Sequence, residues 1–215
     1  FAVGRSTGDD ETPAPADTPT VTPTTIAPTT IAPTTIAPTI ETVVVVGAEG
    51  DVPITFTMPA GWKNSGWGAI KGDPFFGWTT AEVSDIYADP CHWEVVPPFG
   101  PTVDDLVLAW ANVPGFDASA TSDVIVDGYA GKQIEFTVPD YNEEECRERK
   151  YGIWHETEAT NQGPNYWAQG PNEHHRVWIL DVDGTRLVIN AASFPHTSPR
   201  DRAALDAMMT SIQIG

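Results

Sequence analysis

The chain has 215 residues, of which 30 are Asp or Glu and 11 are Lys or Arg, giving a formal net charge of −19. Such an excess of acidic groups argues against a nucleic-acid-binding protein and against docking on an anionic membrane surface, because both need a basic surface. The sequence also lacks any run of about 18 apolar residues, the length typical of a transmembrane helix.

The first 42 residues are predicted to be a disordered spacer rich in Thr, Pro and Ala. Residues 24–38 repeat Thr-Thr-Ile-Ala-Pro three times. A proline in every repeat removes a backbone donor and fixes φ, and the repeat has no period that builds an apolar face. We therefore expect an extended stalk, open to O-linked glycosylation, that holds residues 43–215 away from a membrane or cell wall. Attachment would lie before Phe1, although residues 1–3 fit an arbitrary start as well as the end of a membrane or signal segment.

The first part of the predicted domain is rich in β-strand signals. Residues 43–46 form either an edge strand or the end of the spacer. Apolar residues alternate with others over 52–58, which predicts a half-buried strand, and Pro53 favours an edge position. Residues 67–71 are expected to form another strand. The aromatic and β-branched stretch 75–88 predicts one long strand with a bulge between Val83 and Ile86.

A helix and further strands follow. Thr102 begins a capping box, and an apolar stripe at helical spacing predicts a helix from residue 103 that ends at Pro114-Gly115. Strands are expected at 123–126 and 132–138, on either side of an Asp-Gly turn. Residues 139–173 are predicted to be a long loop that holds one short strand near 151–155.

The last part of the chain gives the strongest signals. Residues 176–182 and 185–194 flank Asp183-Gly184, which is typical of a two-residue hairpin turn. Ser198 and Pro199 then begin a helix with an apolar stripe. The fold class expected is α+β: a mainly antiparallel sheet of about six strands, with two amphipathic helices packed on it.

Cys91 and Cys146 are the only cysteines. Each follows a predicted strand, so the two could meet at one end of a sheet and form a disulfide, as an extracytoplasmic location favours. A reactive thiol is the alternative, since His92 stands beside Cys91.

Four segments resemble a family of uncharacterised actinobacterial extracytoplasmic domains. These are DPCHW at 89–93, PTVDDL at 101–106, VDGYAGK at 126–132 and VWILDVDGTRLVI at 177–189. The resemblance covers about residues 50–214 and implies a membrane-anchored or secreted domain behind a Thr/Pro linker. More weakly, the order of elements is similar to the PsbP/Mog1-like fold. Neither resemblance implies a catalytic residue.

Metal binding and catalysis have little support. His92 and Glu94 are two residues apart on a possible strand, and with His155, Glu156 or the pair at 174–175 they could ligate zinc. The alternative is structural, with His92 beside a disulfide and the pair at 174–175 as a polar strand entrance. No metal-helix spacing is present. Because nucleophile and phosphate-loop motifs are also missing, we predict no catalytic residue and no cofactor.

An aromatic cluster in the long loop is the candidate ligand platform. Trp154, Tyr166 and Trp167 lie near Asn165, and aromatic rings beside amides suit a sugar or another small ligand. Packing of the loop on the domain is the alternative. The sequence thus predicts a non-catalytic extracytoplasmic module that binds a ligand or an envelope protein. The alternative is a secreted hydrolase acting on envelope carbohydrate, which needs two carboxylates in one cleft.

Overall fold

The computed structural model describes residues 40–45, 52–66, 68–157 and 163–215. The predicted spacer up to residue 39 lies outside these ranges, as do Val46 and Trp67. The described residues form an α+β domain with two α-helices, and every strand pair in it is antiparallel, which confirms the predicted fold class.

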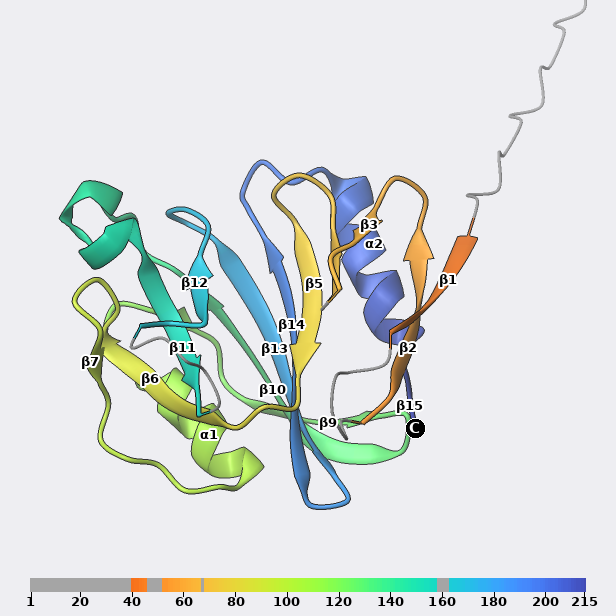
Figure 1. The fold of residues 1–215 in the computed structure, drawn as a ribbon, viewed down its shortest axis with the longest axis horizontal. Coiled ribbons are helices and arrows are strands. Elements are labelled where there is room, and N and C mark those ends of the chain that lie inside the picture. Colours follow the sequence, from red (N-terminus) through yellow and green to blue (C-terminus); the bar gives the residue numbers. More distant parts are fainter. Residues whose placement is uncertain (1–39, 46–51, 67, 158–162) are drawn as a thin grey trace, which may run out of the picture. The chain divides into compact units, whose positions relative to one another are not determined.

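Three sheets share the strands of this domain (Figure 1). The central sheet has the order β3 (Lys63–Asn64), β4 (Gly68–Ile70), β5 (Phe75–Thr79), β14 (Thr185–Ser193), β13 (His174–Val182), β10 (Tyr129–Thr137) and β8 (Asp117–Ala118), with β9 (Ser122–Val126) paired to β10. A second sheet has the order β12 (Tyr166–Ala168), β11 (Tyr151–Glu156), β6 (Val83–Asp89) and β7 (Glu94–Val95). The third consists of β1 (Ile40–Val45), β2 (Ile54–Pro59) and β15 (Gln213–Ile214).

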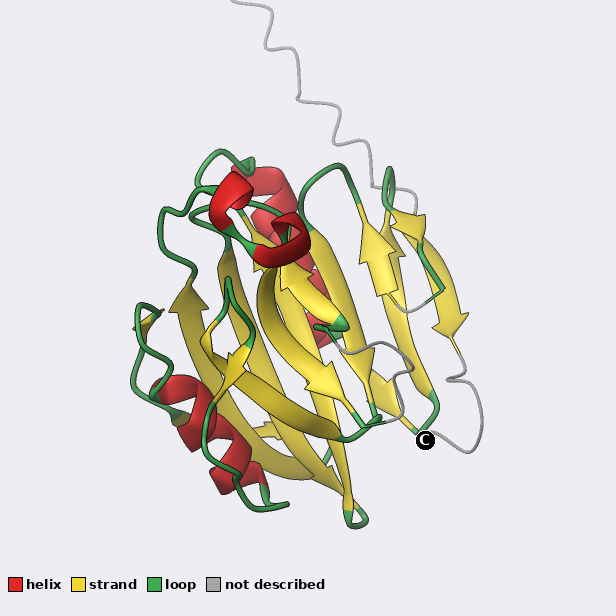
Figure 2. Ribbon diagram, turned by 60° about the vertical axis from the view of Figure 1, so that its left-hand side comes forward, coloured by secondary structure: helices red, strands yellow, loops and turns green. Residues whose placement is uncertain are grey.

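Both faces of the central sheet are covered, so its strands are apolar on both sides. On β13, Trp178 and Leu180 point into a core shared with β2 and α2 (Pro199–Thr210). Val177 and Ile179 alternate with them and point into a second core, shared with α1 (Val103–Ala111) and with β6 and β11. This double burial explains why the hairpin sequence shows no alternation of apolar and polar residues. Figure 2 shows the two helices packed beside the strands.

The helices begin where the sequence predicts. The Thr102 hydroxyl accepts a hydrogen bond from the backbone N–H of Asp105, whose carboxylate accepts one from the Thr102 N–H in return. Ser198 caps α2 in a similar way, with Pro199 as its first residue. Trp110 and Trp178 are buried, as their apolar surroundings predict.

Two strand predictions were wrong. Pro53 favoured an edge position for the strand at 52–58, but β2 lies between β1 and β15. The stretch 75–88 is two strands, because β5 ends at Thr79 and β6 begins at Val83. The Thr79 hydroxyl accepts a hydrogen bond from the Ala81 N–H at 3.1 Å, which stabilises the turn between them. β5 pairs with β14 and β6 with β11, so the chain passes here from one sheet to another. The expected bulge is confirmed, since the register of β6 against β11 shifts at Ser84.

The long loop contains more structure than expected. Its predicted short strand is β11, but β12 was missed, as were two 3₁₀ turns at Glu143–Glu145 and Arg147–Arg149. The sheets also contain more strands than the expected six, because many are only two or three residues long. β1 begins at Ile40, inside the stretch predicted to be spacer.

Candidate ligand-binding site

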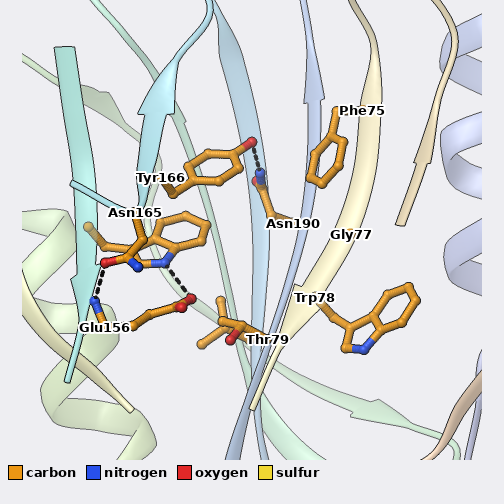
Figure 3. A pocket seen from close by; sticks show the side chains of 10 residues that line it. Phe75, Gly77, Trp78, Thr79, Glu156, Asn165, Tyr166 and Asn190 are labelled. Atoms are coloured by element: carbon orange, nitrogen blue, oxygen red, sulfur yellow. Dashed lines mark hydrogen bonds between the residues drawn. The ribbon is translucent and has the colours of Figure 1, made fainter. Parts of the chain in front are cut away.

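A pocket of about 270 Å³ lies between the central sheet and the sheet of β11 and β12. Its floor comes from paired residues of β5 and β14: Thr79 pairs with Val188, and Gly77 pairs with Asn190. Because Gly77 has no side chain, the space above this pair is left to the pocket and to the Asn190 amide. The Trp78 side chain points away from the other labelled side chains (Figure 3) and packs on Phe56 in the opposite core.

Stacked aromatic rings form one wall of the pocket. The rings of Trp154 and Tyr166 are parallel, with centroids 4.0 Å apart. Trp110 packs against Trp154 from the core side, and the ring centroids of Phe75 and Tyr166 are 6.0 Å apart. The wall is therefore held in place from behind, as a preformed binding surface requires.

A carboxylate marks one end of the pocket. Glu156 Oε1 accepts a hydrogen bond from the Trp154 indole N–H at 3.1 Å. The Glu156 backbone N–H donates to Asn165 Oδ1 at 2.8 Å, so the loop residue Asn165 is tied to β11 (Figure 3). The other oxygen of Glu156 makes no hydrogen bond to a described residue and can accept one from a ligand.

The other end of the pocket carries the Tyr166 hydroxyl. It accepts a hydrogen bond from Asn190 Nδ2 at 2.6 Å, and Asn190 Oδ1 lies 3.3 Å from His175 Nδ1. His175 and Asn190 are only 0% and 2% exposed. A buried polar line therefore reaches the pocket from inside the domain.

Glu173 completes this buried line. Its Oε2 lies 3.6 Å from His175 Nε2 and accepts a hydrogen bond from the Gln169 N–H at 2.7 Å. Glu173 is 1% exposed, and the His175 ring stacks on Phe136. Among the described residues, His175 Nε2 has no hydrogen-bond partner.

Burial raises the pKa of Tyr166 well above its usual value, and the nearby Glu173 raises it further, although the hydrogen bond from Asn190 acts in the opposite direction. The phenol therefore keeps its proton under ordinary conditions. Since its oxygen already accepts from Asn190, the O–H is left to donate.

Three of the four residues predicted as a platform line this pocket: Trp154, Asn165 and Tyr166. Trp154 is only 4% exposed, so it supports the wall instead of offering a flat face to solvent. Trp167 lines an adjacent hollow of about 440 Å³ together with Tyr166 and Asn165, and Lys150 Nζ lies 4.7 Å from its ring centroid.

His92 and Glu94 do not share a strand face, so this part of the metal prediction was wrong. His92 lies in a turn, where its Nδ1 is 2.8 Å from Asp89 Oδ2, and Trp93 has a positive φ of 63°. Only Glu94 belongs to β7. Within the described ranges, no group of three or more His, Cys, Asp or Glu side chains is placed to hold a metal ion.

Cys91 and Cys146 form a disulfide in the structure, with their Cα atoms 4.2 Å apart. The Arg147 N–H donates to the Cys91 carbonyl at 2.9 Å, next to the bond. The bridge joins the end of β6 to the turns before β11, on the sheet that forms the aromatic wall.

Sequence reasoning missed the pocket residues outside the long loop. Asn190 is a single amide in the apolar run of β14, and such a residue signals a buried polar contact. His175 was interpreted as part of a polar strand entrance, yet it is fully buried. Phe75 comes from another strand, and no local pattern shows that it meets them. Glu156 lies in the long loop and was named only as a possible zinc ligand.

Comparisons with known proteins give a likeness in structure only. No family model and no curated protein sequence matches this chain. A crystal structure of LpqN, described as involved in cell envelope biogenesis of Mycobacterium tuberculosis, is similar with 12% identity and a TM-score of 0.41, over 82% of this chain and 91% of that one. The solution structure of cyanobacterial PsbP from Synechocystis is similar with 12% identity and a TM-score of 0.38, over 82% of this chain and 92% of that one.

A PsbP protein is thus among the structures that this chain resembles, while the resemblance to an actinobacterial family stays a prediction. Likenesses of this degree say nothing about what the chain binds.

Proposed function

We propose that the chain is an extracytoplasmic module that binds a small, ring-containing molecule in the pocket between β5 and β11–β12. The observation that carries this proposal is the pairing of a rigid aromatic wall with polar groups at both ends of one pocket. Pockets for small ligands usually combine a mostly apolar lining with a few placed polar groups. A volume of about 270 Å³ suits a ligand smaller than a typical drug molecule.

Glu156 favours a ligand with a cationic or hydroxyl group. Its carboxylate accepts hydrogen bonds only, and one of its oxygens is left for a ligand. The net charge of −19 adds attraction for cations over anions. A cationic group beside Glu156 with its ring against the aromatic wall therefore matches the pocket best.

The disulfide and the predicted Thr/Pro stalk support a location outside the cytoplasm. Stable disulfides belong to oxidising compartments, and a stalk suits a domain held away from a membrane or wall. None of the described helices is both long enough and apolar enough to cross a bilayer. We propose that the region before Phe1 attaches the stalk to a membrane or wall.

The alternative of a secreted hydrolase gains no support from this pocket. Glu156 is the one carboxylate among the described residues that line it, whereas glycoside hydrolysis uses two. We therefore propose binding without catalysis.

The test is an NMR titration that follows the Trp154 indole N–H, which lies at the Glu156 end of the pocket. We expect benzylamine, a ring with one cation, to shift this resonance in a saturable way. Thr79→Phe, which places a ring in the pocket, should abolish the shift. Thr185→Phe, at the exposed first position of β14 beside the β13–β14 turn, should not. A lack of any benzylamine effect, or an effect that survives in Thr79→Phe, contradicts the proposal.

A further inference from the structure

We infer, on the basis of the proposed binding function, that the buried pair His175–Glu173 makes the Tyr166 hydroxyl a hydrogen-bond donor. The pocket then selects small organic cations that carry a hydrogen-bond acceptor at the end opposite their charged group. The inference assigns a specificity role to Tyr166 and a positioning role to His175 and Glu173. Both roles follow from which polar atoms of Asn190, His175 and Glu173 carry a hydrogen.

The Asn190 amide contacts both Tyr166 and His175. Its Nδ2 donates to the Tyr166 oxygen at 2.6 Å, so its Oδ1 must face His175 Nδ1, 3.3 Å away. This second contact is favourable only when Nδ1 carries a hydrogen, because an amide oxygen is only an acceptor. The amide orientation therefore requires a proton on His175 Nδ1.

The other nitrogen of His175 faces a carboxylate. Nε2 lies 3.6 Å from Glu173 Oε2, and both side chains are at most 1% exposed. A bare Nε2 would place two buried acceptors against each other, which is costly. A proton on Nε2 instead gives an imidazolium paired with a carboxylate, and buried charges are normally paired in this way.

The alternative amide orientation gives the opposite specificity. If His175 were neutral with its hydrogen on Nε2, Nδ1 would accept from the Asn190 amide, and Asn190 Oδ1 would accept from the Tyr166 O–H. The Tyr166 oxygen would then offer only lone pairs to the pocket. The charge state of the His175–Glu173 pair thus decides whether the pocket presents a donor or an acceptor at this end.

The two ends of the pocket together define the ligand class. Glu156 accepts from a cationic group, the aromatic wall takes a ring, and the Tyr166 O–H donates to a carbonyl or ether oxygen. An uncharged acceptor fits better than a carboxylate, because Glu156 lines the same pocket and the chain carries a net charge of −19.

Calorimetry with matched probes tests the donor role of Tyr166. Benzylamine carries the cation alone, 4-acetylbenzylamine adds an acceptor, and 4-aminobenzylamine adds a group that mainly donates. We expect the acetyl probe to bind about two- to tenfold more tightly than the amino probe, the range of one neutral hydrogen bond. Tyr166→Phe should remove this preference and keep benzylamine binding, whereas Tyr141→Phe, a tyrosine on the 139–142 loop, should leave it intact.

The positioning role of His175 and Glu173 has its own readout. We expect ¹⁵N shifts that show a hydrogen on both ring nitrogens of His175 in the unmutated protein. Glu173→Gln, which can still accept from the Gln169 N–H, should leave one nitrogen bare and abolish or reverse the acetyl preference. Glu94→Gln on the exposed strand β7 is the matched control and should change neither.

The outcomes separate this inference from the binding proposal. If benzylamine binds but the acetyl probe gains nothing over the amino probe, or if His175 has one bare nitrogen in the unmutated protein, the inference is overturned and the binding site stands. If benzylamine does not bind in the pocket, both proposals fail. A preference that survives Glu173→Gln overturns the positioning role alone.

Discussion

Asn190 shows how one side chain links a buried cluster to a surface pocket. Its strand neighbours are apolar, and its partner across the pair, Gly77, has no side chain to compete for space. The amide can therefore reach both His175 and Tyr166. A larger residue at position 77 would close the pocket and crowd the amide at once.

The buried tyrosines predict a loss of stability at alkaline pH. Burial raises the pKa of Tyr151 to about 12, with a smaller effect of Asp89, and burial also raises the pKa of Tyr87 to about 12, with a smaller effect of Asp85. Since the unfolded chain loses these protons near pH 10, the folded state binds more protons between pH 10 and 12. The stabilisation that these two tyrosines provide should be fully present below pH 10 and should fall as the pH rises toward 12.

Thermal unfolding measured across this range, together with phenolate absorbance, checks the alkaline prediction. The exposed loop acids are already charged there and should contribute no change. A melting temperature that stays constant while the buried phenols titrate would contradict it.

Gly131 predicts a steric requirement in the central sheet. A Cβ on this residue would lie 2.1 Å from the Ile179 carbonyl oxygen on the neighbouring strand. We expect Gly131→Ala to lower the free energy of unfolding by about 1–3 kcal/mol, as overpacking does. Gly170→Ala, whose added carbon would meet Phe194 at an ordinary 3.4 Å, should cost less in the same denaturant titration. Equal costs for the two variants would exclude the steric explanation.

At the scale of elements, short sequence motifs correctly predicted those features that depend on neighbouring residues alone. The capping box at Thr102 and the hairpin turn at Asp183-Gly184 were predicted because each depends on a few neighbouring residues. The division of 75–88 into two strands depends instead on partners that lie far away in the sequence. Phe75 pairs with Ala192 of β14, 117 positions later, and Ile86 pairs with Trp154 of β11, 68 positions later. A pattern of apolar residues cannot show which of two sheets a strand will join.

The same distinction applies to the site. Trp154, Asn165 and Tyr166 could be predicted as binding residues because they lie in one loop that is rich in aromatic and amide side chains. The groups that define their chemistry, Asn190 and His175, come from the hairpin that looked purely structural. Their role arises from packing between two sheets and could not be read from their own segment.

The cap of α1 supplies a prediction at this scale. Thr102→Ala removes the hydroxyl that accepts from the Asp105 N–H at 3.1 Å. We expect the free energy of unfolding to fall by about 1 kcal/mol. Thr102→Ser keeps the hydroxyl and should recover most of that loss in the same measurement, whereas a serine variant as unstable as the alanine variant would contradict the capping role.

At the scale of the whole domain, the Cys91–Cys146 bond joins the second sheet across 55 residues of sequence. In the chain-entropy account, closing a loop of this length stabilises the fold by about 4 kcal/mol. Replacing both cysteines by alanine should lower the unfolding free energy by roughly that amount. Since the aromatic wall lies on the same sheet, benzylamine binding should also weaken, in contrast to a double alanine variant at the exposed Ser119 and Thr121. Unchanged stability in the cysteine variant would contradict a structural bridge.

We propose that one pocket, between the β11–β12 sheet and the central sheet, binds a small organic cation that carries a hydrogen-bond acceptor. A crystal structure of the domain with 4-acetylbenzylamine tests it most directly. We expect the ammonium at Glu156, the ring along the Trp154–Tyr166 wall and the ketone oxygen at hydrogen-bond distance from the Tyr166 hydroxyl. A probe bound elsewhere, or in this pocket with its ends reversed, would contradict it.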